Sequence, residues 1–437
     1  MSVLTEVKLW GTTIGAARVG DYGVCEFGYD PDFLLSGIEL APVKMPLSSR
    51  VYRFPELSAD SFKGLPGMLA DSLPDKFGNA IIDAWLARHG RSRESMNAVE
   101  RLCYIGTRGM GALEYHPTLE PTQKYGDLLE IRDLVQLASA ILTHRDSLDT
   151  YFAKSGEKAE VNRAAFDEIL RVGTSAGGAR AKALIAWNEK TNEVRSGQVS
   201  HDADYSQWLI KFDGVQNNRD KEAADPQGFG LIEYAYYLMA QDAGVIMPEC
   251  RLFEENGRSH FMAKRFDRTP EGGKLHMQSL AALDHLDFNM AGAHSYEQAY
   301  QMMQTLSLSK VEMEQQFRRM IFNIVARNQD DHVKNISYLM DRHGEWSLSP
   351  AYDVTYSYNP NGNWTSAHQM TLNGKRDHFL TDDFIACEKL IGLPRGRAKR
   401  ILAEVVDVVK NWQSYANQAQ VYPEHIEKIQ ATHRLEW

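Results

Sequence analysis

The period of the apolar positions changes several times along the chain, and each change predicts a different element. Residues 3–10 and 22–29 alternate loosely between turn signals, which predicts short strands. Asp75 then precedes Lys76–His89, where apolar residues recur at helical spacing until Gly90 supplies a stop. The chain is therefore predicted to open with an α/β module.

A strand-rich stretch follows a charged connector whose pattern is helical. Its apolar runs predict four short strands, at Ala183–Trp187, Trp208–Phe212, Arg251–Phe253 and His260–Phe266. One helix is predicted at about 228–242, and residues beyond 275 return to helical spacing, notably at Phe317–Val325 and from Ile401 to Trp412. A small mixed sheet with one packed helix should therefore precede a helix-rich lobe.

Turn signals suggest where these parts meet. Glycine-rich turns alternate with apolar pairs over Leu102–Tyr115, and Pro117 and Pro121 mark a change of unit. We therefore predict an α+β fold class with four parts, which are an accessory module at 1–120, a helical connector at 121–160, a strand-rich lobe at 161–270 and a mainly helical lobe at 271–437.

The composition is that of an ordinary folded protein, with 43% apolar and 24% charged residues in 437. A net charge of -10 disfavours direct nucleic-acid binding as the main activity. The four cysteines lack CxxC spacing, so we expect neither a zinc site nor disulfides. Reduced cysteines fit a cytoplasmic location, which we therefore expect. No leader pattern and no apolar stretch of membrane-spanning length is visible, so we expect no membrane association.

A glycine-rich segment at 173–182, GTSAGGARAK, is the first candidate for chemistry. Its start formally matches the G-x-S-x-G nucleophile elbow of hydrolases, which needs a strand before the serine and a helix after it. The predicted order here is the reverse, because Phe166–Arg171 has a helical pattern and Ala183–Trp187 a strand pattern. A glycine-rich loop before a strand can instead bring backbone N–H groups close to phosphate oxygens. An ordinary hinge loop between domains is the alternative.

Two charged residues interrupt apolar elements. Lys211 lies in a predicted strand, where a buried lysine needs an anionic partner, and Glu233 lies on the helix predicted at about 228–242. A Lys–Glu ion pair whose lysine reaches phosphate oxygens is the arrangement of protein kinases. An edge-strand lysine and a solvated glutamate are the alternative.

The most informative spacing is in Asn328–Asn335. Asp330 and Asn335 stand five positions apart, as do the catalytic aspartate and the magnesium-binding asparagine of the protein-kinase loop D-x-x-x-x-N. A predicted hairpin then leads to Asp353, at the place of the second magnesium ligand. The short motif is weak alone, but its order after the glycine loop, Lys211 and Glu233 is more specific.

Two acidic and histidine clusters have simpler interpretations. The run 201–204, HDAD, is expected to be a solvated turn, because the separated ligand set of a metal site is lacking. The same lack argues against an HD-type hydrolase around Asp330 and His332. His332 is expected to shape its loop, since Asp330 already supplies the base.

Taken together, these motifs resemble the HipA family of bacterial serine/threonine kinases, the toxins of toxin–antitoxin pairs. The resemblance runs nearly end to end. It is carried by the LPD of Leu65–Asp75, the IG…GA of 105–112, the S-x-x-G-x-x-x-K loop Ser175–Lys182, Lys211, Arg265–Arg268, the loop Asp330–Asn335 and the pair Tyr352 and Asp353.

The resemblance implies a two-lobed, protein-kinase-like fold, with the glycine loop in the strand-rich N-lobe and the catalytic loop in the helical C-lobe. Asp330 would be the catalytic base, Asn335 and Asp353 would hold Mg²⁺, and Glu233 would form the structural ion pair. The residues implied to bind ATP are Gly177, Gly178, Ala179, Arg180, Ala181, Lys182, Lys211, Lys264, Arg265, Phe266, His332, Asn335, Tyr352 and Asp353.

Regulation and partners are also implied by the resemblance alone. Ser175 would be an autophosphorylation site whose modification ejects the loop, with Thr174 beside it as the other possible site. The expected partners are a small helix-turn-helix, HipB-like antitoxin, through which DNA is bound indirectly, and a protein substrate, a class that includes aminoacyl-tRNA synthetases in this family. The alternative is a kinase-like binding module that transfers no phosphate, which the retention of Asp330, Asn335 and Asp353 disfavours.

Overall fold

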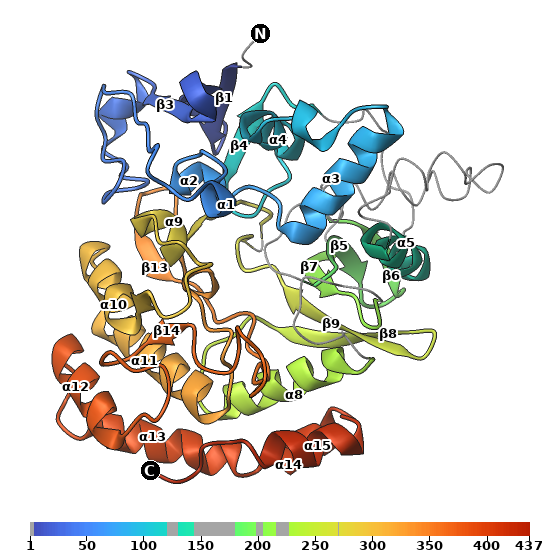
Figure 1. Ribbon diagram of the computed structural model, residues 1–437, viewed down its shortest axis with the longest axis vertical. Helices are drawn as coiled ribbons and strands as arrows, with labels where there is room; N and C mark the ends of the chain where they lie inside the picture. The colour runs from blue at the N-terminus through green and yellow to red at the C-terminus, as the bar shows by residue number, and fades with distance from the viewer. Residues whose placement is uncertain (1–3, 120–129, 144–179, 198–203, 216–226, 270) are drawn as a thin grey trace. The chain divides into compact units, whose positions relative to one another are not determined.

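The computed structural model describes residues 4–119, 130–143, 180–197, 204–215, 227–269 and 271–437 (Figure 1). The chain divides into two compact units. The first comprises Met1–Gly230 and Arg251–His276, and the second comprises Leu231–Cys250 and Met277–Trp437. Both units contain helices and strands, so the protein is of the mixed α/β kind that the sequence pattern predicts.

The first unit opens with an antiparallel sheet of order β3-β2-β1-β4. Its strands are β1 (Leu4–Leu9), β2 (Thr12–Val19), β3 (Cys25–Tyr29) and β4 (Leu113–His116). β1 and β3 confirm the two predicted strands, whereas β2 has no predicted counterpart because its glycine and alanines give no alternating apolar pattern. Gly15 is required in β2, since a Cβ there would lie 2.3 Å from the carbonyl oxygen of Gly28.

The helices of this module are α1 (Ala59–Phe62), α2 (Gly67–Ala70), α3 (Lys76–Arg88) and α4 (Ala98–Ile105). α3 begins where predicted, because the Asp75 carboxylate caps it by accepting a hydrogen bond from the Gly78 N–H (2.6 Å). Turns were expected from residue 102 onward, but residues 102–105 belong to α4, so the expectation is wrong for these residues. A capping box begins α4, the helix ends only at Gly106 (φ 58°), and the strand of the IG…GA motif starts at Leu113.

A five-stranded sheet of order β6-β5-β7-β9-β8 follows in the first unit. Its strands are β5 (Lys182–Asn188), β6 (Glu193–Ser196), β7 (Ser206–Lys211), β8 (Cys250–Glu255) and β9 (Arg258–Lys264), and they confirm the four predicted strands. α5 (Ile131–Thr143) confirms the helical pattern of that part of the connector. Ile81 of α3, Leu134 of α5 and Trp208 of β7 belong to one hydrophobic core, so the accessory module and this sheet are packed together.

The second unit is mainly helical, as predicted. Its helices are α8 (Phe229–Asp242, the first two residues belonging to the first unit), α9 (Leu280–Asp284), α10 (Tyr296–Thr305), α11 (Lys310–Val325), α12 (Thr381–Ile391), α13 (Arg397–Val409), α14 (Trp412–Gln418) and α15 (Pro423–Gln430). α11 is its central helix, because every residue from Gln316 to Val325 is buried. A capping box of Ser309 and Glu312 fixes where α11 begins.

The predicted helix from Ile401 to Trp412 is interrupted. α13 ends at Val409, and Trp412 is instead the first residue of α14. The indole of Trp412 is fully buried, donates a hydrogen bond to the carbonyl of Ile426 (3.0 Å) and packs against the ring of Tyr236. This tertiary packing places the tryptophan, and helical spacing alone does not reveal it.

Short strands connect the helices of the second unit. β10 (His276–Ser279), β12 (Ser337–Met340) and β13 (Trp346–Leu348) form a sheet of order β10-β12-β13, and β11 (His294–Ser295) pairs in parallel with β14 (Met370–Thr371). The antiparallel pair β12 and β13 confirms the hairpin predicted before Asp353. Within the described ranges, no helix has the length and apolar character needed to cross a membrane.

Candidate active site

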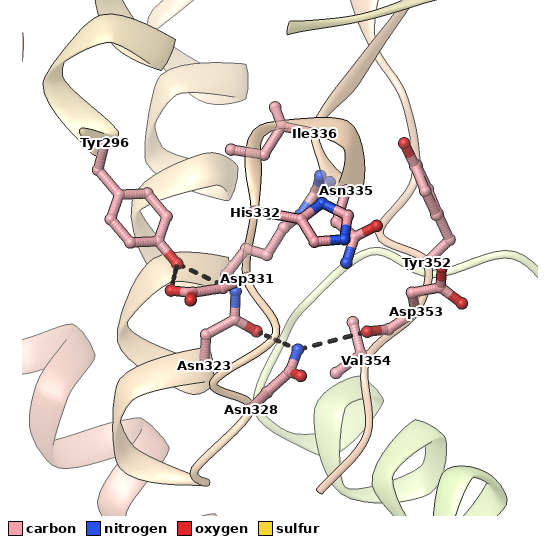
Figure 2. A pocket seen from close by; sticks show the side chains of 11 residues that line it. Tyr296, Asn323, Asn328, Asp331, His332, Asn335, Ile336, Tyr352, Asp353 and Val354 are labelled. Carbon is pink, nitrogen blue, oxygen red and sulfur yellow. Dashed lines mark hydrogen bonds between the residues drawn. The ribbon is translucent and has the colours of Figure 1, made fainter. Parts of the chain in front are cut away.

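A pocket in the second unit lies where the loop after α11 meets the segment after β13 (Figure 2). It is lined by Tyr296, Arg319, Asn323, Asn328, Asp331, His332, Asn335, Ile336, Tyr352, Asp353 and Val354. The fold therefore brings four of the predicted site residues together, namely His332, Asn335, Tyr352 and Asp353.

Asn335 is held by its own loop. The Asn335 side-chain nitrogen Nδ2 donates a hydrogen bond to the backbone carbonyl of Asp330 (2.8 Å). A carbonyl oxygen can only accept, so the amide nitrogen faces the loop and Oδ1 faces away from this bond. The Asn335 Oδ1 atom is therefore the one that can coordinate a cation.

Asp353 has a left-handed backbone (φ 52°), a conformation that costs a non-glycine residue about 1–3 kcal/mol and persists only where neighbours enforce it. Asn328 is such a neighbour, since its Nδ2 donates to the Asp353 carbonyl (3.4 Å) and to Asn323 Oδ1 (3.0 Å), as Figure 2 shows. The hydroxyl of Tyr352, the residue before Asp353, donates a hydrogen bond to the carbonyl of Lys334 (2.6 Å). This bond attaches Tyr352 to the loop that carries Asn335. This arrangement presents Asp353 in the pocket that Asn335 lines.

Asp330 has a half-exposed side chain, with 43% of its surface accessible. The indole Nε1–H of Trp364 donates a hydrogen bond to Asp330 Oδ1 (2.7 Å). His332 Nε2 lies 3.9 Å from the same oxygen, which is beyond hydrogen-bonding distance. The predicted loop-shaping role of His332 stays a prediction.

The side chain of the neighbouring Asp331 is buried. Its carboxylate accepts hydrogen bonds from the Tyr296 hydroxyl (2.7 Å), from His368 Nδ1 (2.8 Å) and from the Gln369 backbone N–H (2.8 Å). Burial raises the pKa of the Asp331 carboxyl, but the charge and hydrogen bonds around it outweigh burial and hold the pKa below its usual value. The Asp331 carboxylate is thus ionised and held in place by three hydrogen bonds.

Arg319 adds a positive charge to the same pocket. Its guanidinium is buried, and Nη2 donates to the carbonyl of Ser349 (2.8 Å). Burial lowers the pKa of Arg319 to about 10, so the group remains charged at neutral pH. The pocket therefore combines the carboxylates of Asp331 and Asp353 with one guanidinium.

Only the end of the glycine-rich loop belongs to the described part of the first unit. Ser175, Gly177, Gly178 and Ala179 lie outside the described residues, so their roles stay predictions, and so does the choice between Ser175 and Thr174. The Arg180 guanidinium lies over the ring of Phe229, 5.6 Å from its centroid, and Ala181 is buried beside it in sequence.

Lys182 forms an ion pair that its motif does not reveal. Its Nζ lies 3.3 Å from the Asp75 carboxylate, and both side chains are almost fully buried. Lys182 is also directly opposite Lys211 in the pairing of β5 with β7, so the two lysines share one face of the sheet. Two ammonium groups and one carboxylate therefore gather where the glycine loop ends.

Lys211 is buried, and its Nζ lies 5.6 Å from the centroid of the Phe261 ring. Lys211 is the last residue of β7, which confirms the predicted strand, and its role as a phosphate ligand stays a prediction. Glu233 is also buried, on α8. Glu233 belongs to the second unit and Lys211 to the first, and their pairing stays a prediction.

Three further residues that are expected to bind ATP, Lys264, Arg265 and Phe266, lie at the end of β9 and directly after it. Lys264 is exposed and Phe266 half-buried, whereas the Arg265 side chain is buried in hydrogen bonds to the Asp267 carboxylate (2.9 and 2.7 Å). Its backbone N–H donates to the carbonyl of Gln207 (2.9 Å). The side chain of Arg265 therefore serves the fold, and a nucleotide contact by this residue would come from its backbone carbonyl.

Three residues whose side chains bond to the carboxylate of Asp330 or Asp331 lie outside the predicted set, namely Tyr296, Trp364 and His368. Each is 34 to 37 positions from the aspartate that it contacts. No spacing rule connects residues at that separation, so no signal in the sequence marks them as part of the site. Among the described residues, no three or more histidine, cysteine, aspartate or glutamate side chains are grouped so that they could hold a metal ion.

The fold and the loop define the class of this protein. It is a mixed α/β protein in which Asp330 and Asn335 stand five positions apart, a spacing that matches the protein-kinase motif D-x-x-x-x-N, and in which Asp353 follows a hairpin. A family model described as the HipA N-terminal domain matches residues 5–116, and one described as the HipA-like C-terminal domain matches residues 174–412. The chain belongs to the HipA family, as its motifs indicate.

Similar proteins agree with this assignment. A chain of the solved complex of HipA, HipB and operator DNA from Shewanella oneidensis MR-1 has the same fold, with a TM-score of 0.65 and 15% identity over 98% of this chain and 94% of that one. The Sinorhizobium fredii kinase candidate Y4dM is 30% identical over 163 residues, which are 34% of this chain and 36% of Y4dM. A Haemophilus influenzae kinase candidate is 24% identical over 233 residues, or 46% of this chain and 67% of that protein. The match to Y4dM thus spans little more than a third of that protein's length.

Proposed function

We propose that this protein is a Mg-ATP-dependent serine/threonine protein kinase, the toxin of a toxin–antitoxin pair. The observation that carries the proposal is the pocket of the second unit, which is lined by both Asn335 and Asp353 and adjoins Asp330 through the Asn335 hydrogen bond. Phosphoryl transfer depends mainly on positioning and charge neutralisation, and these residues supply a base and two metal ligands.

The oxygen atoms present fit a magnesium ion. Asn335 Oδ1 and the Asp353 carboxylate are hard donors, and protein-bound Mg²⁺ commonly takes one or two such ligands together with water and phosphate oxygens. When bound, the ion would neutralise negative charge on the phosphoryl group. Asp330 would accept the proton of the substrate hydroxyl.

The face of the five-stranded sheet that carries Lys182 and Lys211 supports the proposal of a phosphate ligand. Lys182 and Lys211 stand side by side at the end of the glycine-rich loop, and ammonium groups are common ligands of nucleotide phosphates. Backbone N–H groups of Gly177–Ala179 would add donors to those phosphates. Asp75 would keep Lys182 oriented, because its carboxylate lies within ion-pair distance of the lysine.

The proposed partners follow from relatives. The Shewanella complex contains HipA, HipB and operator DNA, and we extend that assembly to this chain as a small helix-turn-helix antitoxin that binds DNA. The net charge of -10 fits a chain that reaches DNA through a partner. Self-phosphorylation of Ser175 and a cytoplasmic protein substrate, such as an aminoacyl-tRNA synthetase, complete the proposal.

Purified protein with labelled ATP tests the proposal. Asp330→Asn and Asp353→Asn should abolish phosphate transfer to the protein itself and to substrate proteins. Asp407→Asn is the matched control, since it makes the same charge change at a side chain that is 75% exposed in the same unit. Undiminished transfer by the Asp330 variant would overturn the assignment of the base. If the wild type binds Mg-ATP and transfers none of its phosphate, the protein is the alternative, a binding module.

A further inference from the structure

We infer that Trp364 is a positioning residue that fixes the catalytic carboxylate of Asp330, and that His368 anchors the segment 364–369 carrying it. The inference rests on the proposed function, in which Asp330 is the base. It assigns a role to a side chain that comes from outside the catalytic loop and outside every motif of the sequence.

The contact is specific in its chemistry. An indole N–H can only donate, and a carboxylate can only accept, so the 2.7 Å bond between Trp364 Nε1 and Asp330 Oδ1 has one possible sense. It occupies one oxygen of the carboxylate and leaves Oδ2 for a substrate hydroxyl. The Asp330 side chain is half-exposed, so packing around it does not fully restrict the rotation of its carboxylate. The hydrogen bond from Trp364 supplies that restriction.

The segment 364–369 is itself tied to the loop at successive residues. The side-chain nitrogen Nε2 of Gln369 donates to the carbonyl of Gln329 (3.2 Å) and also to the carbonyl of Trp364. The backbone N–H of Gln369 donates to Asp331 (2.8 Å). Trp364 therefore sits at one end of a segment whose other end is bonded to the residues on either side of Asp330.

His368 holds that other end through both ring nitrogens. Its Nδ1 lies 2.8 Å from the buried Asp331 carboxylate, and its Nε2 lies 3.2 Å from Nη1 of Arg434. Arg434 is fixed in turn by an ion pair with Asp377. The anchor is thus buried and fully oriented.

The expected effect follows from positioning. A displacement of about 1 Å in a catalytic group can cost on the order of 100-fold in rate. Trp364→Phe keeps an aromatic ring and removes only the donor, so we expect kcat to fall by about 10- to 100-fold. KM for ATP should stay within about twofold, because the bond that is removed goes to Asp330, the proposed base, which is not among the proposed nucleotide ligands.

Full-length Trp364→Phe, compared with Trp10→Phe, tests the inference with labelled ATP. Trp10 is a matched control, since its Nε1 also donates a 2.7 Å bond, to the carbonyl of Lys274 in the first unit. As a second pair, His368→Gln keeps a donor toward Asp331 and should retain more activity than His368→Leu. Melting temperature and Mg-ATP affinity are measured for every variant.

The outcomes separate the two proposals. A wild type that transfers no phosphate contradicts the proposed function. A wild type that is active, with a Trp364→Phe variant of equal kcat, overturns the positioning role and leaves the kinase proposal intact. A higher kcat in the variant also overturns it, because the contact would then restrain the base. If kcat, the melting temperature and the affinity for Mg-ATP all fall in the Trp364→Phe variant, the residue has a structural role. That outcome counts against the inference.

Discussion

Asp267, three residues after the end of β9, gives a direct test of how the accessory module is joined to the five-stranded sheet of the first unit. Its carboxylate is fully buried and accepts hydrogen bonds from the Gly111 N–H, from Arg268 and twice from Arg265, at 2.7 to 2.9 Å. Asp267→Asn removes the charge and places an amide that cannot accept all four bonds. The two guanidiniums, with side chains only 2% and 11% exposed, lose this counter-charge.

Breaking a buried charge network by neutralising one partner typically costs about 3–5 kcal/mol. For a domain of about 150–250 residues, each kcal/mol lowers Tm by roughly 2–4 °C, so a fall of about 6–20 °C is expected. Thermal unfolding at pH 7 measures it, with the exposed Asp407→Asn as the control that should not move Tm. A Tm change under about 2 °C for Asp267→Asn would refute the reasoning that this network holds the module.

The pH dependence of the same difference gives a second check. Burial raises the pKa of Asp267, but Arg265 and Arg268 outweigh it and hold the pKa well below its usual value. A carboxyl whose folded-state pKa is depressed stabilises the fold fully above its unfolded pKa of about 3.9, and this stabilisation is lost as pH falls through the folded pKa. The difference in stability between wild type and Asp267→Asn should therefore be largest at neutral pH and shrink below about pH 4.

Three further predictions concern the site. Lys211→Ala should weaken Mg-ATP binding by about tenfold or more, because a lost charge-assisted hydrogen bond costs about 1.5–3 kcal/mol. Calorimetric titration measures the affinity, and an unchanged value would remove Lys211 from the phosphate site. Asp331→Asn should lower kcat and Tm together, because the buried carboxylate accepts three hydrogen bonds, and an unaltered Tm would contradict its anchoring role. Mass spectrometry should find phosphate on Ser175 of active protein but not of Asp330→Asn; phosphate in both forms would argue against self-modification, and phosphate on Thr174 would correct the site.

Several elements follow from local patterns in the chain, and the structure agrees with them. α3 and α11 were predicted from apolar residues at helical spacing, and the strands β5 and β7 from short apolar runs. The hairpin β12–β13 follows from two apolar runs around a turn. The prediction of one helix from Ile401 to Trp412 was wrong because of a contact distant in sequence, since Trp412 is buried against Tyr236 and starts a new helix.

The sequence by itself determined elements such as α3, α11 and β5, the family motifs and the five-residue separation of Asp330 from Asn335, because each depends only on residues close together along the chain. Only the tertiary structure decided that Trp364 donates to Asp330 and that Asp75 pairs with Lys182. The partners in these contacts are 34 and 107 positions apart, and their meeting depends on how distant segments pack. Side-chain packing between such segments leaves no period in the sequence, so the residues that orient a site emerge only when the chain is folded.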